Sequence, residues 1–205
     1  MSYSHIIFDF NGTLTDSSEI IYEIVSGMIE KSGFGNITPK DFENIRDLPI
    51  LKRIKVLIFT AMYTGKFLKL YSRQLPNLKF ADGIKPMLTR LNENGLRYSV
   101  LSSNSPDMIQ RLFELHQMPV GPIYTSHRLY GKKRAIKDFI KQNGCGAGDI
   151  LYIGDEKSDI IACNKCGADI VFVKWGIGAG EDISGCDVKA IAQSPEELTE
   201  FLLGC

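Results

Sequence analysis

The feature that most constrains this chain is a short apolar run near the N-terminus that stops at a carboxylate. Residues 6–8 (Ile-Ile-Phe) lead into Asp9, and Gly12-Thr13-Leu14 follows two residues later. A short apolar run bounded by turn residues is typical of a buried β-strand. The pattern therefore predicts Asp9 at the carboxyl end of a strand, where open α/β sheets place their ligands. A carboxylate there can bind a metal or attack phosphorus, and the N–H groups of the turn can hold an anion.

Apolar runs and helical patterns alternate through the C-terminal part of the chain. Runs at 98–101, 123–125, 150–154 and 170–175 are separated by amphipathic patterns at 84–94, 106–116, 132–140 and 160–168. A serine and a proline, Ser194-Pro195, mark the start of a terminal helix. Strands that alternate with helices form a parallel sheet, so we expect five parallel strands flanked by helices.

Several of these strands end at polar side chains. Ser102-Ser103-Asn104 follows one run, and Asp155 follows another, with Asp159 four residues later. Lys132 and Lys133 start a helical pattern, although cations oppose the macrodipole at that end of a helix. A serine at a strand end is often only a turn residue, and a lysine pair is often only solvated. The residues alone leave both alternatives open.

Taken in order, these motifs resemble the haloacid dehalogenase (HAD) superfamily. The first family motif has an aspartate nucleophile, a second aspartate two residues later, and Gly-Thr-Leu; this chain matches it except that Asn11 replaces the second aspartate. The resemblance implies an α/β fold with a HAD-like Rossmannoid core, in which the first strand is central and lies beside strand 150–154. It also implies a core of residues 1–16 and 82–205, with an inserted all-helical C1-type cap at 17–81, as in phosphoglycolate phosphatases.

The resemblance also implies a Mg²⁺-dependent phosphatase that forms an aspartyl phosphate on a small phosphorylated metabolite. Asp9 would be the nucleophile, and Lys132, with Lys133 as the competitor, would neutralise negative charge. The metal would be held by Asp9, the backbone carbonyl of Asn11 and Asp155, with Asp159 bonding a metal water or Lys132. Phosphate binding would involve Gly12, Thr13, Ser102 (or Ser103 in its place), Asn104 and Lys132.

Asn11 is the departure that bears on mechanism. In the family this side chain protonates the leaving group and then activates water, whereas an amide cannot exchange a proton at neutral pH. General acid–base catalysis contributes roughly 10²–10⁴-fold in rate. We therefore expect a slow phosphatase, or one suited to leaving groups that need no proton. A phosphonate-cleaving enzyme, a phosphotransferase and a catalytically weak binding or scaffold protein are the alternatives.

The segment expected to form the cap has an uneven charge. Residues 48–81 contain seven basic side chains and no acidic one. A basic cap would favour a substrate with a second anionic group, whereas the simpler interpretation is a solvated helix face. The expected helix at 49–74 accounts for most of these side chains, and Asp16 is expected to cap an earlier helix together with Glu19.

Net charge, hydropathy and cysteine content argue against nucleic-acid-binding, membrane and secreted proteins. Lys+Arg and Asp+Glu number 24 each, so the formal net charge is zero and gives no nucleic-acid or membrane signature. No apolar run reaches membrane-spanning length, and the N-terminus shows no signal peptide. The five cysteines lack a framework spacing, which favours a reducing cytoplasm, and Cys163-x-x-Cys166 is interpreted as packing. The three histidines, including His127, lack metal spacing, and nothing indicates the oligomeric state.

Overall fold

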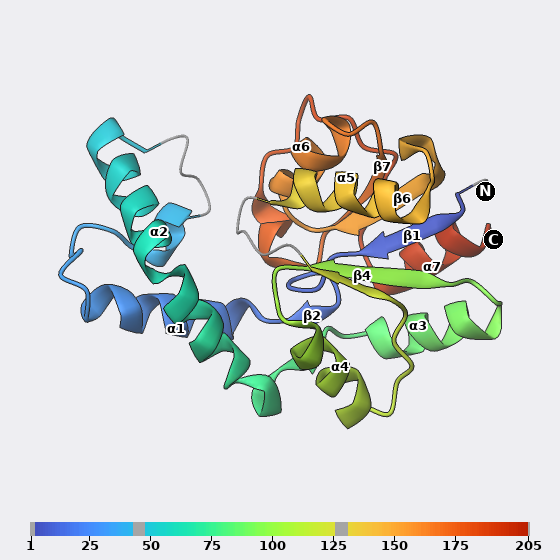
Figure 1. Cartoon of the computed structure of the whole chain (residues 1–205), viewed down its shortest axis with the longest axis horizontal. Coiled ribbons are helices and arrows are strands. Elements are labelled where there is room, and N and C mark those ends of the chain that lie inside the picture. Colours follow the sequence, from blue (N-terminus) through green and yellow to red (C-terminus); the bar gives the residue numbers. More distant parts are fainter. Residues whose placement is uncertain (1–2, 43–47, 126–130, 205) are drawn as a thin grey trace. The chain divides into compact units, whose positions relative to one another are not determined.

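The computed structural model describes residues 3–42, 48–125 and 131–204 (Figure 1). Its contacts divide the chain into two units. One unit comprises residues 1–17 and 79–205, and the other comprises residues 18–78. Each unit is described by itself below. Among the described residues, no helix is both long and apolar enough to cross a membrane.

The larger unit is built on a six-stranded parallel sheet with the strand order β5-β4-β1-β6-β7-β8. The strands are β1 (His5–Phe8), β4 (Tyr98–Ser102), β5 (Ile123–Thr125), β6 (Ile150–Gly154), β7 (Asp169–Val173) and β8 (Ala190–Ala192). The predicted α/β class is confirmed, and β1 lies centrally between β4 and β6 as expected. The predicted number of strands is wrong, because β8 adds a sixth strand that pairs with β7.

Helices cover both faces of this sheet (Figure 1). α3 (Ile84–Glu93), α4 (Pro106–Leu115) and α7 (Pro195–Leu203) lie on one side, and α5 (Lys132–Asn143) and α6 (Lys157–Asn164) lie on the other. Single turns of 3₁₀ helix, η4 (Ala147–Asp149) and η5 (Ile177–Gly180), join the remaining elements. Under α5 and α6 the core contains Ile7, Tyr152, Phe139 and Phe172, all 0–1% exposed. Burial of these large side chains fixes the strand ends that present polar groups.

Two helix boundaries differ from the sequence expectation. α6 begins at Lys157 rather than near residue 160, because Asp159 Oδ2 accepts a hydrogen bond from the Glu156 backbone N–H and closes the first turn. α1 begins at Ser18, and Asp16, the residue expected to cap this helix, lies two residues earlier in a short strand.

That short strand belongs to a two-stranded antiparallel sheet at the point where the helical unit is inserted. β2 (Thr15–Asp16) pairs with β3 (Lys79–Phe80), with Thr15 opposite Phe80. Each strand has two residues, too few to show an alternating pattern, so the pairing could not be foreseen from local sequence.

The smaller unit is a pair of helices, α1 (Ser18–Glu30) and α2 (Ile50–Ser72), with the short turns η1 (Pro39–Phe42) and η3 (Leu75–Asn77). Its own core contains the buried residues Met28, Ile29, Ile37, Val56 and Phe59. Asp41 accepts a 2.6 Å hydrogen bond from the Thr38 backbone N–H and pairs with Lys52 at 2.7 Å.

Candidate active site

Asp9 lies directly after β1 at the carboxyl edge of the sheet. Its backbone N–H donates to the Ile153 carbonyl at 2.9 Å, which continues the pairing with β6. Its carboxylate is buried, and Oδ2 accepts a 2.8 Å hydrogen bond from Lys132 Nζ at the start of α5. The two lysines that the sequence left as competitors are thereby distinguished, because Lys132 reaches Asp9 whereas Lys133 is exposed.

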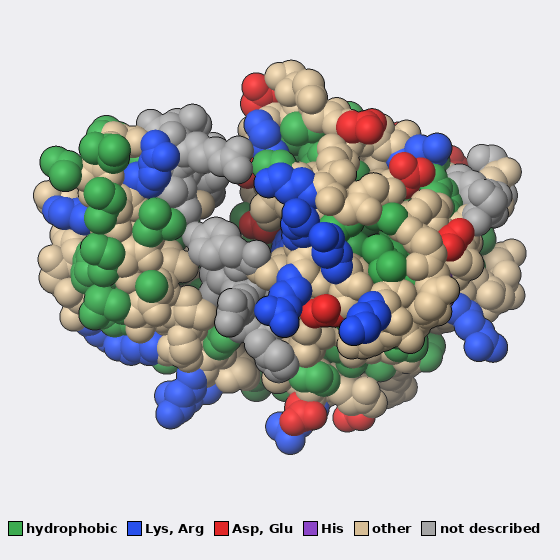
Figure 2. Space-filling model, turned by 45° about the horizontal axis from the view of Figure 1, so that its top comes forward, with side chains coloured by type: hydrophobic (Ala, Val, Ile, Leu, Met, Phe, Trp, Pro, Cys, Tyr) green, Lys and Arg blue, Asp and Glu red, His purple; other side chains and the backbone are tan. Residues whose placement is uncertain are grey.

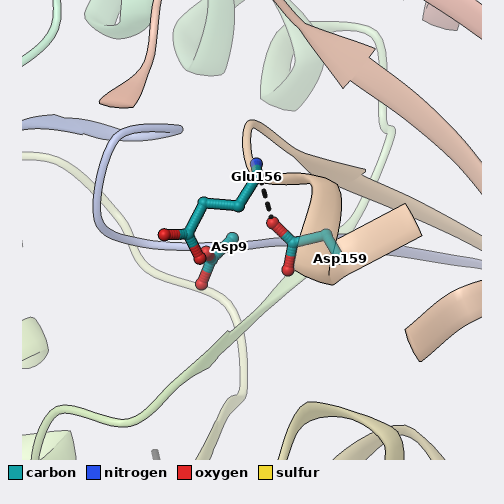
Figure 3. Close-up of side chains that lie close together, drawn as sticks. All are labelled: Asp9, Glu156 and Asp159. Atoms are coloured by element: carbon teal, nitrogen blue, oxygen red, sulfur yellow. Dashed lines mark hydrogen bonds between the residues drawn. The ribbon is translucent and has the colours of Figure 1, made fainter. Parts of the chain in front are cut away.

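The Lys132 ammonium is shared by three carboxylates. Nζ lies 2.5 Å from Asp159 Oδ1, 2.8 Å from Asp9 Oδ2 and 3.2 Å from Glu156 Oε2. Oxygens of these three carboxylates all lie within 4.8 Å of one another, and Figure 3 shows them converging from the end of β1 and the start of α6. The ammonium already provides the counter-charge of this group. We therefore interpret the three carboxylates as the residues that hold the Lys132 side chain in place.

Burial and mutual charge shift the acidities in this cluster. Burial raises the pKa of Asp9, although the nearby ammonium partly offsets the effect. Burial also raises the pKa of Asp159 well above its usual value. The Lys132 ammonium lowers the pKa of the half-exposed Glu156. Burial opposes the charge of Lys132, but Asp159, Asp9 and Glu156 outweigh it and hold the lysine pKa well above its usual value.

Asp155 lies at the end of β6 and is held by the turn that follows β1. Its Oδ1 accepts a 2.9 Å hydrogen bond from Thr13 Oγ1. Gly12 has φ +78°, and a Cβ at that position would collide with the Asp155 carboxylate. Only glycine combines that backbone conformation with so close an approach.

A loop after β7 closes around the same carboxylate. The Gly178 backbone N–H donates to Asp155 Oδ2 at 3.2 Å, and a Cβ on Gly176 would also collide with this side chain. The indole of Trp175 donates to the Thr13 carbonyl at 2.9 Å. The glycine-rich loop at residues 176–180 therefore packs on Asp155.

Burial, followed by the charge of Asp9, raises the pKa of Asp155 to about 7. Four carboxylates, on Asp9, Asp155, Glu156 and Asp159, thus face a single ammonium among the described residues. A buried excess of negative charge must be relieved by protons or by a cation. Carboxylate oxygens are the ligands that hard divalent cations prefer, so the acidic groups of this site have the chemistry to hold such an ion.

A third group of polar residues lies at the end of β4. Ser102 is buried, and its Oγ accepts a 3.1 Å hydrogen bond from the Asn104 backbone N–H. The Asn104 side chain is also buried, and its Nδ2 donates to Asn11 Oδ1 at 3.1 Å. Ser103 is exposed, so of the two serines it is Ser102 that belongs to this hydrogen-bonded group.

Glu156 is the member of the cluster that the sequence motifs did not predict as a site residue. Its position directly after Asp155, at the end of an apolar run, was the available signal. The remaining polar candidates are structural where they are described. His5 packs edge-on against Phe139, and Cys163 is buried in the core, as the packing interpretation expected. His127 lies outside the described residues.

Comparison with known proteins places this geometry in a family. The family model for haloacid dehalogenase-like hydrolases matches residues 6–173. A phosphoglycolate phosphatase from Synechococcus elongatus is 24% identical over 95% of each chain. A haloacid dehalogenase-like family hydrolase from Streptococcus pneumoniae has a similar fold, with a TM-score of 0.72 at 19% identity over 98% of this chain and 99% of that one. CbbY from Rhodobacter sphaeroides, solved in complex with phosphate, has a TM-score of 0.70 at 13% identity over 96% of each chain. The chain therefore belongs to the haloacid dehalogenase-like hydrolase family.

Proposed function

We propose that this chain is a Mg²⁺-dependent phosphomonoester hydrolase that acts on a small phosphorylated metabolite. The observation that carries the proposal is the pairing of the buried Asp9 carboxylate with Lys132 at 2.8 Å beside a second buried carboxylate, Asp155. The similarity to a protein named phosphoglycolate phosphatase supports the choice of a phosphorylated substrate. The helical unit, residues 18–78, is part of the proposal as a cap of the C1 type.

In the first step, a carboxylate oxygen of Asp9 attacks phosphorus. A bond forms between that oxygen and phosphorus, and the bond between phosphorus and the substrate oxygen breaks, which leaves an aspartyl phosphate and an alkoxide. Lys132 stabilises the negative charge on the nucleophile and on the phosphoryl oxygens. Ser102 Oγ and the backbone N–H of Thr13 would donate hydrogen bonds to the phosphoryl group, whereas the Gly12 N–H already donates to the Thr15 carbonyl at 3.0 Å. Water then hydrolyses the aspartyl phosphate.

Asp9, the carbonyl of Asn11 and Asp155 would hold Mg²⁺. When bound, this ion neutralises charge on the transferring phosphoryl group. Asp159 and Glu156 act on the site through Lys132, which both contact. The two acidic residues therefore hold the ammonium in place and keep it charged.

Asn11 limits the rate of both steps in this proposal. Its amide can donate a hydrogen bond to the leaving oxygen, but the proton that an alkoxide needs must come from water. Loss of a general acid and base is worth roughly 10²–10⁴-fold, about 3–5 kcal/mol in barrier height. We therefore propose a slow enzyme, with acyl or aryl phosphates as its best substrates.

The test is a screen of phosphorylated metabolites, together with an aryl phosphate, with and without Mg²⁺. The proposal expects phosphate release that requires Mg²⁺ and is lost in Asp9→Asn. An aspartyl phosphate trapped by acid quench would identify the intermediate. Cation-independent release, or equal rates in wild type and Asp9→Asn, would contradict the proposal.

A further inference from the structure

The helical unit carries an apolar surface along one side of α2. Nine large hydrophobic side chains are exposed in the described part of the chain, and six of them lie on this helix. These six, here called the α2 face, have 44–75% of their surface exposed and are Ile50, Leu51, Ile54, Leu57, Ile58 and Met62. Figure 2 shows hydrophobic side chains gathered over this unit. Single exposed apolar residues are ordinary, whereas a contiguous patch marks an interaction site.

The α2 face cannot turn inward within its unit. Its residues recur at spacings of three and four, which places them on one side of the helix. The opposite side is already packed, because Val56 and Phe59 are buried and Phe59 stacks on Tyr63 with ring centroids 4.7 Å apart. The helix therefore has two apolar sides, and one of them is used by the core of the unit.

Charged side chains of opposite sign lie on the two helices. Lys55, Lys66 and Lys69 on α2, and Arg73 directly after its last residue, are exposed along one edge of the α2 face and are here called the basic rim. α2 contains no acidic residue. On α1, Glu19, Glu23 and Glu30 are exposed at spacings of four and seven, which forms an acidic stripe on one side of that helix.

We propose that the α2 face is a dimer interface between two copies of this chain, in which the basic rim of each copy pairs with the acidic stripe of the other. A two-fold contact joins the same patch on both subunits, so the patch must complement itself. Two helix pairs that bury their apolar sides against each other form a four-helix bundle, which is a stable arrangement. The apolar centre with a charged rim also has the composition of a standard interface, which buries about 800 Å² per partner.

A second copy fits these charges better than an anionic lipid surface does. Lipid headgroups would attract the basic rim but repel the acidic stripe of α1, whereas another copy satisfies both. The sequence alone left the basic side chains of this segment as substrate-binding or simply solvated. Their position beside an exposed apolar face gives them a role that does not depend on the proposed phosphatase activity.

The test is the mass of the full chain in solution by sedimentation equilibrium. A dimer is expected, and Ile58→Glu or Met62→Glu should raise its dissociation constant roughly a hundredfold or more, because each copy then places a charge in an apolar contact. Leu115→Glu is the matched control, since Leu115 is 63% exposed on α4 in the other unit. That variant should remain dimeric, and thermal unfolding at low concentration should show all three variants folded.

Mixed charge reversals test the pairing of rim and stripe. One chain carries Lys66→Glu with Lys69→Glu, and a second carries Glu19→Lys with Glu23→Lys. Each should dimerise roughly tenfold more weakly alone, because rim and stripe then have the same sign. An equimolar mixture should recover the wild-type affinity. A wild-type chain that is monomeric at every concentration, a dimer unaffected by Ile58→Glu, or a monomer that sediments with phosphatidylserine vesicles would overturn the proposal.

Discussion

Asn104 Nδ2 donates a 3.1 Å hydrogen bond to the side-chain oxygen of Asn11. Asn104 is held in turn by its backbone N–H, which donates to Ser102 Oγ at 3.1 Å. The carbonyl end of the Asn11 amide therefore faces Asn104, and its NH₂ end is directed elsewhere. In the proposed reaction only the NH₂ end could stabilise a departing alkoxide, so Asn104 is a positioning residue for Asn11.

Replacing Asn104 by aspartate should reverse the Asn11 amide. An aspartate only accepts hydrogen bonds, so Asn11 would turn its NH₂ group toward residue 104 and present its carbonyl oxygen to the leaving group. Removing one donor from a developing oxyanion costs about 10²–10³-fold. We expect kcat/KM for an alkyl phosphate to fall by about this factor, with a much smaller fall for an aryl phosphate.

Ser105→Asp is the control for the added charge in that experiment. Ser105 is exposed and caps α4 by accepting a hydrogen bond from the Met108 backbone N–H, and aspartate is an equally good cap. This variant should affect the two substrates alike. Equal losses on both substrates in Asn104→Asp would instead show that Asn104 has only a structural role.

Asn11→Asp should restore a general acid and base. The new carboxyl group can protonate the leaving oxygen and then take a proton from water, so turnover of an alkyl phosphate should rise by roughly 10²–10⁴-fold. Aryl phosphate turnover should rise less, because that leaving group needs little protonation. Steady-state phosphate release measures both rates. No gain on the alkyl substrate would show that Asn11 does not limit the reaction.

Lys132→Met should damage both activity and stability. Three carboxylates would lose their shared counter-charge, and removal of one partner from a buried ion pair costs about 3–5 kcal/mol. Urea unfolding at neutral pH measures this loss, and Mg²⁺-dependent phosphate release should become undetectable. Lys133→Met removes the same charge from the exposed neighbour and should change neither quantity.

The metal-free chain should lose stability as the pH rises through neutrality. The pKa of Asp155 is about 7 in the folded chain, against 3.8 as its ordinary value. A raised pKa in the folded state means that the folded state binds more protons than the unfolded state. The stabilisation contributed by Asp155 is therefore fully present below about pH 4 and is lost as the pH passes 7. The difference amounts to up to about 4 kcal/mol for this one group.

Unfolding in EDTA across that pH range would measure the effect of Asp155. In Asp155→Asn, the part of the stability loss with rising pH that comes from this carboxyl group should be absent. Mg²⁺ should restore stability to the wild type at pH 8, since binding to the folded state is linked to folding. If Mg²⁺ stabilised Asp155→Asn by the same amount, Asp155 would not be a ligand.

Gly176→Ala should weaken cation binding. A Cβ at Gly176 would meet the Asp155 carboxylate, so either the loop or that side chain must move. Gly180→Ala is the matched control, because a Cβ there meets nothing within 4 Å. Trp175 is the single tryptophan of the chain and bonds Thr13 beside the site, so its fluorescence can report Mg²⁺ titration. The affinity for Mg²⁺ should fall in the first variant only.

The strand-end carboxylates were predictable from local sequence because an apolar run and a turn determine where a strand stops. Asp9 and Asp155 lie at such ends, on neighbouring strands. Glu156 was not predictable as a partner of Lys132, because their contact joins the starts of two helices that are remote in sequence. The loop glycines were recognisable as a turn, but packing on Asp155 is a tertiary contact that glycine spacing does not encode.

Very short strands, and helices with two apolar sides, were also difficult to predict from sequence. β8 has only three residues, which is too short a pattern to predict a strand from sequence. It is a strand because its residues pair with β7. The helix α2 itself was predictable, because the expected range 49–74 lies within two residues of the observed Ile50–Ser72 at each end. Which of its two apolar sides would be covered depends on α1, so the exposed α2 face became visible only in the folded unit.

The pairing of β2 with β3 has a consequence for how such a chain can be rebuilt. The helical unit leaves the larger unit after β2 and returns through β3, so its two ends are held about 5 Å apart, at the spacing of neighbouring strands. A hairpin turn of two residues spans the same gap. The segment is thus a module whose chain leaves and re-enters at adjacent positions, so it can be shortened, exchanged or grafted without rerouting any strand of the main sheet.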